Sequence, residues 1–311
     1  MVELAVDDSG RRVATKRVVL AGSGPQIREA RARLRREAEI LRSLAHPGIV
    51  PVLDIVEDGA DLVLVLPAMA ENLEDRLRRL GPLPEAEVVR VGRVLLEALS
   101  AAHRQGIVHR DIKPANVLFD AAGRPALADF GAAVTNDMTA GLTAPGTVVG
   151  TPMWMAPEQA RGGPAGPAGD VFSLAATLVF AASGAGPYQP GPPLAVLGRA
   201  AAGDVLPLPR AVPATLRGPL SQMLSADPER RPSAAAVLGG VGGTRSAPAR
   251  PAAAPARPLP ARPAAAAAPS HRARPAAAVG GAGRRGARSP QARGPPVHRG
   301  RRVQLSCNAT Q

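Results

Sequence analysis

The chain has 311 residues, 45% hydrophobic and 20% charged, a length that suits one large domain with a tail or two small domains. Its one cysteine, Cys307, excludes an intrachain disulfide framework and a cysteine-based metal site, which suits a reducing, cytoplasmic setting. The net charge of +13 belongs to residues 241–311, which hold 13 arginines and no Asp or Glu. We expect no signal peptide, and the longest apolar run, 171–182, predicts a buried helix, because it is too short to cross a bilayer.

The first 66 residues have the pattern of a small, strand-rich unit. Alternating apolar residues predict strands over 2–6, 13–20, 49–56 and 62–66. Between the second and third strands, apolar residues recur at helical spacing from Ile27 to Ala45. This spacing predicts a helix that ends at His46-Pro47.

The rest of the chain divides into a mainly helical region and a low-complexity tail. A hinge over 67–70 and a short helix over 72–80 precede a long amphipathic helix over 85–104. Short strands are expected over 117–119 and 126–128, followed by mainly helical structure to about residue 240. Residues 241–311 are rich in Arg, Pro and Ala and almost lack large apolar side chains, so we expect a disordered tail.

Two short motifs carry the chemistry. The sequence His-Arg-Asp-Ile-Lys-Pro-Ala-Asn spans 109–116, and Asp-Phe-Gly begins 13 residues after its last member. Phosphoryl transfer needs a carboxylate to orient the attacking hydroxyl, a cation on the moving phosphate and oxygen ligands for Mg²⁺. These groups are supplied by Asp111, Lys113, Asn116 and Asp129.

The use of lysine supports this interpretation. Among 38 basic residues, Lys16 and Lys113 are the only lysines. Where a compact ammonium is needed on phosphate oxygens, the planar arginine fork does not replace it. We therefore expect both lysines to be functional.

Together these residues resemble eukaryotic-like (Hanks-type) bacterial serine/threonine protein kinases, and the resemblance covers about residues 2–240. It implies an α+β, two-lobed protein-kinase fold with a small β-rich N-lobe and a helical C-lobe. The implied boundaries are 1–66 for a partial N-lobe, 67–70 for the hinge, 71–240 for the C-lobe and 241–311 for the tail. The implied activity is ATP- and Mg²⁺-dependent phosphorylation of protein substrates on Ser and Thr.

The resemblance also implies a role for each site residue. Asp111 would orient the hydroxyl of the protein substrate, and Lys113 would neutralise the γ-phosphate in the transition state. Asn116 and Asp129 would bind Mg²⁺ through oxygen. Lys16 would hold the α- and β-phosphates of ATP.

A glutamate on the following helix should pair with Lys16. Glu37 borders the apolar stripe of that helix, whereas Glu39 lies about 200° further round and should face solvent. We expect structural roles for His109, for Asp170 and for a Glu158–Arg231 ion pair, with Arg230 as the competing partner.

The segment from Asp129 to Glu158 resembles an activation loop. Within it, Thr151 would contact Asp111 and Lys113. Thr143, then Thr147, are the favoured autophosphorylation sites, ahead of Thr135 and Thr139, and self-association would serve this reaction. Arg110 would pair with the phosphorylated residue.

The chain departs from the family pattern at its start. The first strand and the glycine-rich phosphate loop would lie before Met1, so we expect an abridged sequence with weaker ATP binding. The alternative is a pseudokinase scaffold that binds partners without phosphoryl transfer. A specific nucleic-acid-binding role rests on the basic tail alone, which has no aromatic residue for base stacking.

Overall fold

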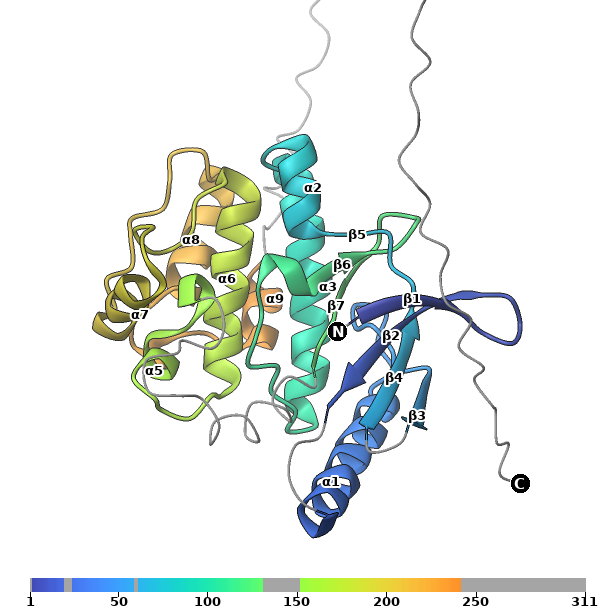
Figure 1. Ribbon diagram of the computed structural model, residues 1–311. Helices are drawn as coiled ribbons and strands as arrows, with labels where there is room; N and C mark the ends of the chain where they lie inside the picture. Colours follow the sequence, from blue (N-terminus) through green and yellow to red (C-terminus); the bar gives the residue numbers. More distant parts are fainter. Residues whose placement is uncertain (1, 20–23, 59–60, 131–151, 242–311) are drawn as a thin grey trace, which may run out of the picture. The chain divides into compact units, whose positions relative to one another are not determined.

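The computed structural model describes residues 2–19, 24–58, 61–130 and 152–241, with the side chains of residues 25, 26, 37 and 241 left undescribed (Figure 1). The predicted tail beyond Val241 and the loop over 131–151 lie outside these residues. The described residues form the expected α+β arrangement of a strand-rich N-lobe and a mainly helical C-lobe. None of the described helices has the length and apolar character needed to cross a membrane.

The N-lobe is an antiparallel sheet backed by one helix. The described strands lie in the order β1 (Val2–Val6), β2 (Arg12–Val18), β4 (Asp61–Pro67), β3 (Asp54–Asp58). Helix α1 (Gly24–Ser43) covers one face of this sheet, where Leu34 packs against Val18 and Leu62 (Figure 1). Alternate residues of each strand point to this face, which is why one apolar stripe on α1 suffices to close it.

The strand predicted over 49–56 is wrong in its first half. Strand β3 begins only at Asp54, and Ile49 instead forms an isolated parallel bridge with Leu127 of the C-lobe. The Val50 N–H also donates to the Leu127 carbonyl at 2.8 Å. The apolar residues before β3 are thus buried against the C-lobe, and this contact ties the two lobes together.

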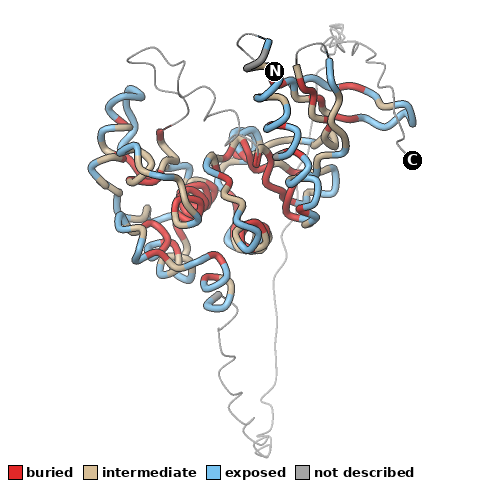
Figure 2. The backbone as a smooth tube through the Cα atoms, turned by 90° about the horizontal axis from the view of Figure 1, so that it is seen from below, coloured by how far each residue is buried: buried red, intermediate tan, exposed pale blue. Residues whose placement is uncertain are grey.

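The C-lobe is built around two long helices. Helix α3 (Glu85–Arg104) has the predicted bounds, and α6 (Pro167–Ser183) contains the predicted buried run. Helix α6 buries most of its residues and α3 buries one face, both in one large core, which Figure 2 shows in red along the interior helices. Shorter helices surround them: α2 (Leu73–Leu80), α5 (Pro157–Ala160), α7 (Pro193–Ala202), α8 (Ala214–Met223) and α9 (Ala234–Val241).

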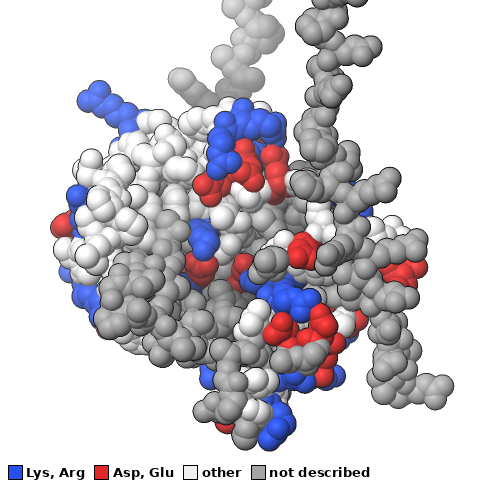
Figure 3. All heavy atoms as spheres, viewed as in Figure 1, with Lys and Arg blue, Asp and Glu red and all other residues white. Residues whose placement is uncertain are grey.

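A small antiparallel sheet sits beside α2 and α3. It consists of β5 (Glu71–Asn72), β6 (Val117–Phe119) and β7 (Pro125–Leu127). Arg76 of α2 stacks 4.4 Å above the Phe119 ring while its guanidinium pairs with Glu71 and, at 2.6 Å, with Glu87 of α3. Charges of both signs therefore gather over α2, as Figure 3 shows near the top of the view.

The predicted ion pair of the C-lobe is present. Arg231 donates from Nη1 and Nη2 to the two carboxylate oxygens of Glu158 at 2.6 and 2.8 Å. The Arg231 side chain is fully buried and also donates to three backbone carbonyls, those of Ser225, Ala168 and Ala226. Burial raises the pKa of Glu158, but the hydrogen bonds from Arg231, a backbone hydrogen bond and the charges of Arg231 and Arg161 together outweigh burial, so the net shift is downward.

We expect Arg231→Ala to lower the free energy of unfolding by about 3 kcal/mol, because it leaves a partly buried carboxylate and several carbonyls without their donor. The matched control is Arg230→Ala, since the Arg230 side chain is 81% exposed and pairs only weakly with Asp227. That change should stay within about 0.5 kcal/mol of the parent. Thermal and denaturant unfolding of both variants measure the difference, and equal stabilities would contradict the assigned role.

Candidate active site

The β6–β7 hairpin brings the two motifs together. Val117 pairs with Leu127, so the residues just outside the strands, Asn116 and Ala128, face each other, and the Ala128 N–H donates to the Asn116 carbonyl at 2.9 Å. Asp129 follows directly. The antiparallel register therefore places Asn116 and Asp129 at the same open end of the hairpin.

The loop before β6 folds into a compact hydrogen-bonded cluster. A 3₁₀ turn over Pro114–Asn116 begins with a proline, whose fixed φ suits the first position of a turn. Lys113 Nζ lies 2.7 Å from Asp111 Oδ2. Asn116 Nδ2 donates to the Asp111 carbonyl at 2.7 Å and to Asp111 Oδ2 at 3.1 Å. The structure thus joins three of the predicted residues directly.

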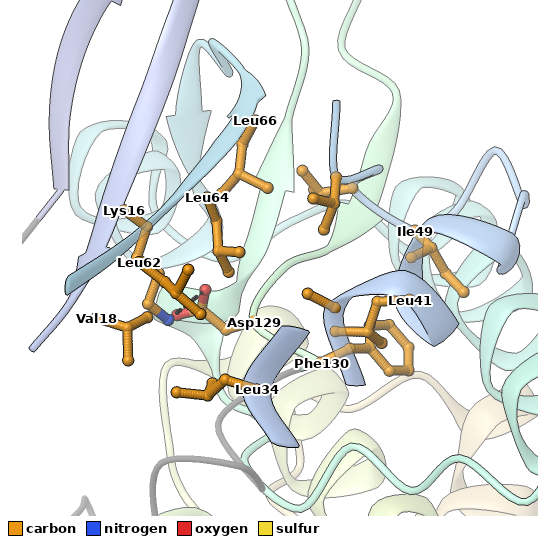
Figure 4. Close-up of a pocket in the computed structure, with 13 residues that line it drawn as sticks. Lys16, Val18, Leu34, Leu41, Ile49, Leu62, Leu64, Leu66, Asp129 and Phe130 are labelled. Carbon is orange, nitrogen blue, oxygen red and sulfur yellow. Dashed lines mark ion pairs between the residues drawn. The ribbon is translucent and has the colours of Figure 1, made fainter. Parts of the chain in front are cut away.

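Lys16 reaches Asp129 from the N-lobe. It lies on β2 between Val2 of β1 and Leu64 of β4, which fixes its backbone from both sides. Its Nζ lies 2.8 Å from Asp129 Oδ1, and both side chains are partly exposed (Figure 4). Lys16, a strand residue far from the Asp-Phe-Gly motif in the sequence, therefore lies at the same site as Asp129.

An apolar cavity adjoins this ion pair. Lys16 and Asp129 are its charged members, and the sheet, α1, the segment between α1 and β3, and the C-lobe supply the rest (Figure 4): Val18, Leu34, Ala38, Leu41, Ile49, Val50, Val52, Leu62, Leu64, Leu66 and Phe130. The ion pair therefore borders an apolar space while both of its side chains remain partly exposed to solvent.

The expected glutamate partner of Lys16 is undecided. Glu37 lies in α1, but its side chain is outside the described part of the structure, so its pairing with Lys16 stays a prediction. Glu39 is exposed, as expected, and its carboxylate lies 3.4 Å from Nε of Arg35 on the same helix.

A buried carboxylate from α6 holds the start of the His-Arg-Asp motif. Asp170 is 1% exposed and accepts the N–H groups of His109 and Arg110, each at 2.8 Å. The Nε2 of His103, on α3, lies 2.8 Å from the same carboxylate. Asp170 therefore has the structural position expected from the sequence, with three donors around it.

Two residues of the site have left-handed backbones. Arg110 has φ 71° and Asp129 has φ 66°, and they are the non-glycine residues with positive φ in the described part of the chain. Such a conformation costs about 1–2 kcal/mol for a side chain with a Cβ, so surrounding contacts must hold it. Both strained residues flank the cluster of Asp111 and Asn116.

The His109 side chain links the loop that contains Asp111 to the residue before Asp129. It is fully buried, its Nε2 lies 2.8 Å from the Ala128 carbonyl, and its ring packs 4.5 Å from that of Phe130. A carbonyl only accepts, so Nε2 carries the proton and Nδ1 accepts the Asp111 N–H at 3.3 Å. Burial lowers the pKa of His109, which keeps the ring neutral.

Sequence reasoning missed two residues of this region. His103 follows Leu99 by four positions and so continues the inward stripe of α3, a signal that its side chain would be buried. Gln159 directly follows Glu158, and its Nε2 donates to the Arg110 carbonyl at 3.3 Å. No local pattern marks Gln159, because its partner lies 49 residues earlier.

We expect folding stability to fall as the pH drops below about 6.5, the ordinary pKa that the unfolded histidine regains. Below that pH the histidine takes up a proton in the unfolded chain but stays neutral when buried in the folded protein. The free energy of unfolding should therefore fall with a limiting slope of about 1.4 kcal/mol per pH unit. His109→Phe should be less stable than the parent at pH 8, since it loses the bond to Ala128, but the gap should narrow towards pH 5. Denaturant unfolding across this range tests it, and a constant gap would contradict the assignment.

Comparison with known proteins gives consistent matches. A family profile described as a protein kinase domain matches residues 1–240. The chain is 35% identical over 240 residues to the DNA damage-responsive serine/threonine-protein kinase RqkA of Deinococcus radiodurans, covering 74% of this chain and 35% of that protein. It is 37% identical over 213 residues to the serine/threonine-protein kinase PknK of Mycobacterium tuberculosis, covering 66% and 19%.

A third relative is the serine/threonine-protein kinase PkaA of Streptomyces coelicolor, which is 38% identical over 206 residues, covering 65% of this chain and 38% of that protein. The chain therefore spans well under half the length of these three relatives.

Proposed function

We propose that this chain, which belongs to the protein kinase family, transfers the γ-phosphate of ATP to serine and threonine hydroxyls of protein substrates. The observation that carries the proposal is the hydrogen-bonded cluster of Asp111, Lys113 and Asn116. It meets the Lys16–Asp129 pair across the end of one hairpin. A carboxylate, two ammonium groups and amide and carboxylate oxygens are the set that phosphoryl transfer requires.

In this proposal Asp111 and Lys113 act on the reacting atoms. The Asp111 carboxylate would accept or orient the proton of the attacking hydroxyl. Lys113, 2.7 Å from that carboxylate, would balance the negative charge that grows on the transferred phosphoryl group. Serine or threonine as acceptor agrees with the names of the relatives.

The donor set at the hairpin end fits a magnesium nucleotide. Within the described residues, no group of three or more His, Cys, Asp or Glu side chains could hold a metal ion by itself. Asn116 and Asp129 would supply side-chain oxygens, and nucleotide phosphates with water would complete the ligand set that Mg²⁺ prefers. Bound there, Mg²⁺ would neutralise charge on the phosphates.

Lys16 would turn to the phosphates when ATP binds. Its present bond to Asp129 is an ion pair between partly exposed groups, the kind that contributes little net stability. It can therefore exchange for phosphate and metal contacts at small cost. Glu37 would then hold the ammonium in place from α1.

Regulation would come from the loop between Asp129 and Glu158. Thr143 and Thr147 remain the proposed autophosphorylation sites, with self-association of two chains bringing one loop to the other's site. Arg110 would hold the phosphate through paired hydrogen bonds. A cytoplasmic location and a domain boundary near residue 240 also remain predictions.

We expect Asp111→Asn to reduce phosphorylation of a generic protein acceptor, such as myelin basic protein, by at least about a hundredfold. Its fold should persist, because the amide can still accept from Lys113 and Asn116. The control is Asp204→Asn, an exposed residue far along the chain, which should retain parental activity. Incorporation of labelled γ-phosphate measures both, and full activity in the Asp111 variant would overturn the mechanism.

Lys16→Met should raise the KM for ATP and lower kcat, because the ammonium on the phosphates is lost. Lys16→Arg should not restore activity, since the planar guanidinium cannot replace a compact ammonium at this point. Arg12→Met, an exposed change on the same strand, is the control. Steady-state kinetics at varied ATP decide the matter, and a fully active Arg variant would remove Lys16 from the site.

A further inference from the structure

Both backbone polar groups of Arg110, whose φ is positive, form hydrogen bonds with other parts of the C-lobe. On one side its N–H donates to Asp170 Oδ1 at 2.8 Å. On the other its carbonyl accepts from Gln159 Nε2 at 3.3 Å. Asp170 lies on α6 and Gln159 on α5, so residues from two separate helices hydrogen-bond to the backbone of one residue.

These two hydrogen bonds fix the orientation of the peptide group between Arg110 and Asp111. The Arg110 carbonyl belongs to the peptide that joins the two residues, and that peptide is rigid and planar. Fixing the carbonyl therefore fixes the N–H of Asp111, which donates to His109 Nδ1 at 3.3 Å. With φ at 71°, an arginine released from its ties would relax towards the right-handed region and carry Asp111 with it.

Gln159 is itself held in place. Its Oε1 accepts the N–H of Ala156 at 3.2 Å, a cap on the first turn of α5. The neighbouring Glu158 is bound by buried Arg231. The amide thus has two functions that can be separated: an oxygen that accepts within α5, and a nitrogen that donates to Arg110.

We infer that Gln159 is a positioning residue for Asp111, and that its Nε2 donor is the operative group. The inference rests on the proposed function, in which Asp111 orients the substrate hydroxyl. Loss of the donor frees the Arg110 carbonyl and misaligns the Asp111 carboxylate. ATP contacts through Lys16, on the opposite lobe, are unaffected.

Two substitutions of Gln159 separate the donor from the cap. Gln159→Glu keeps an oxygen for the Ala156 N–H but cannot donate to Arg110. Gln159→Met keeps the length of the side chain and loses both bonds. Gln222→Glu, an exposed change on α8, controls for the added negative charge.

The full chain would be assayed with ATP, Mg²⁺ and myelin basic protein. We expect Gln159→Glu to lower kcat by about fivefold to tenfold, the effect of one lost hydrogen bond, with KM for ATP and Tm unchanged. Gln159→Met, which also loses the cap on α5, should lower kcat at least as much. Gln222→Glu should match the parent.

Parental kcat in Gln159→Glu would overturn the inference, whether or not Gln159→Met is impaired, because the cap alone would then matter. A fall in kcat of Gln159→Glu that is explained by a fall in its Tm would also overturn the inference.

Amide hydrogen exchange provides a readout independent of activity. In Gln159→Glu, peptides that contain Arg110 and Asp111 should exchange faster, while those from α3 should not change. Unchanged exchange at Asp111 would refute the positioning role. An inactive parent that nevertheless shows the exchange difference would refute the proposed function and leave the positioning role supported.

Discussion

The arrangement of the site depends on the buried carboxylate of Asp170. It accepts two consecutive backbone N–H groups, from His109 and Arg110, and contacts His103 as well. A buried carboxylate without donors would be costly, so this position is stable only while the loop keeps its shape. The dependence is mutual, because Arg110 holds a left-handed backbone that it would leave without these contacts. The central helix α6 thereby sets the geometry of a loop some 60 residues earlier.

A second constraint joins the halves of the site. The β6–β7 register aligns Asn116 with Ala128, and Asn116 in turn donates to Asp111. Asp111, Asn116 and Asp129 thus belong to one small rigid unit, while Lys16 arrives from a separate sheet. Two ion pairs lie at this site: Lys113 with Asp111, and Lys16 with Asp129. Such pairing stabilises a crowded polar site next to an apolar cavity.

Contact between the lobes is made largely by apolar chain before β3. The Val50 N–H donates to the carbonyl of Leu127, two residues before Asp129, and the Leu127 N–H donates to the Gly48 carbonyl. The N-lobe is therefore joined to the end of β7, close to where the Asp129 carboxylate meets Lys16. The same contact explains the incorrect strand prediction, since an alternating apolar run does not reveal whether it pairs with its own sheet or with another lobe.

The sequence by itself determined what depends on neighbours along the chain. The repeat of apolar residues predicted β1, α3 and β6 with their observed bounds, and one contiguous motif contained Asp111, Lys113 and Asn116. Only the tertiary structure decided which distant groups meet. It placed Lys16 against Asp129, brought Gln159 to Arg110, and set His103 against Asp170. Periodicity reports which face of an element is buried, whereas these partners are selected by how whole helices and sheets pack together.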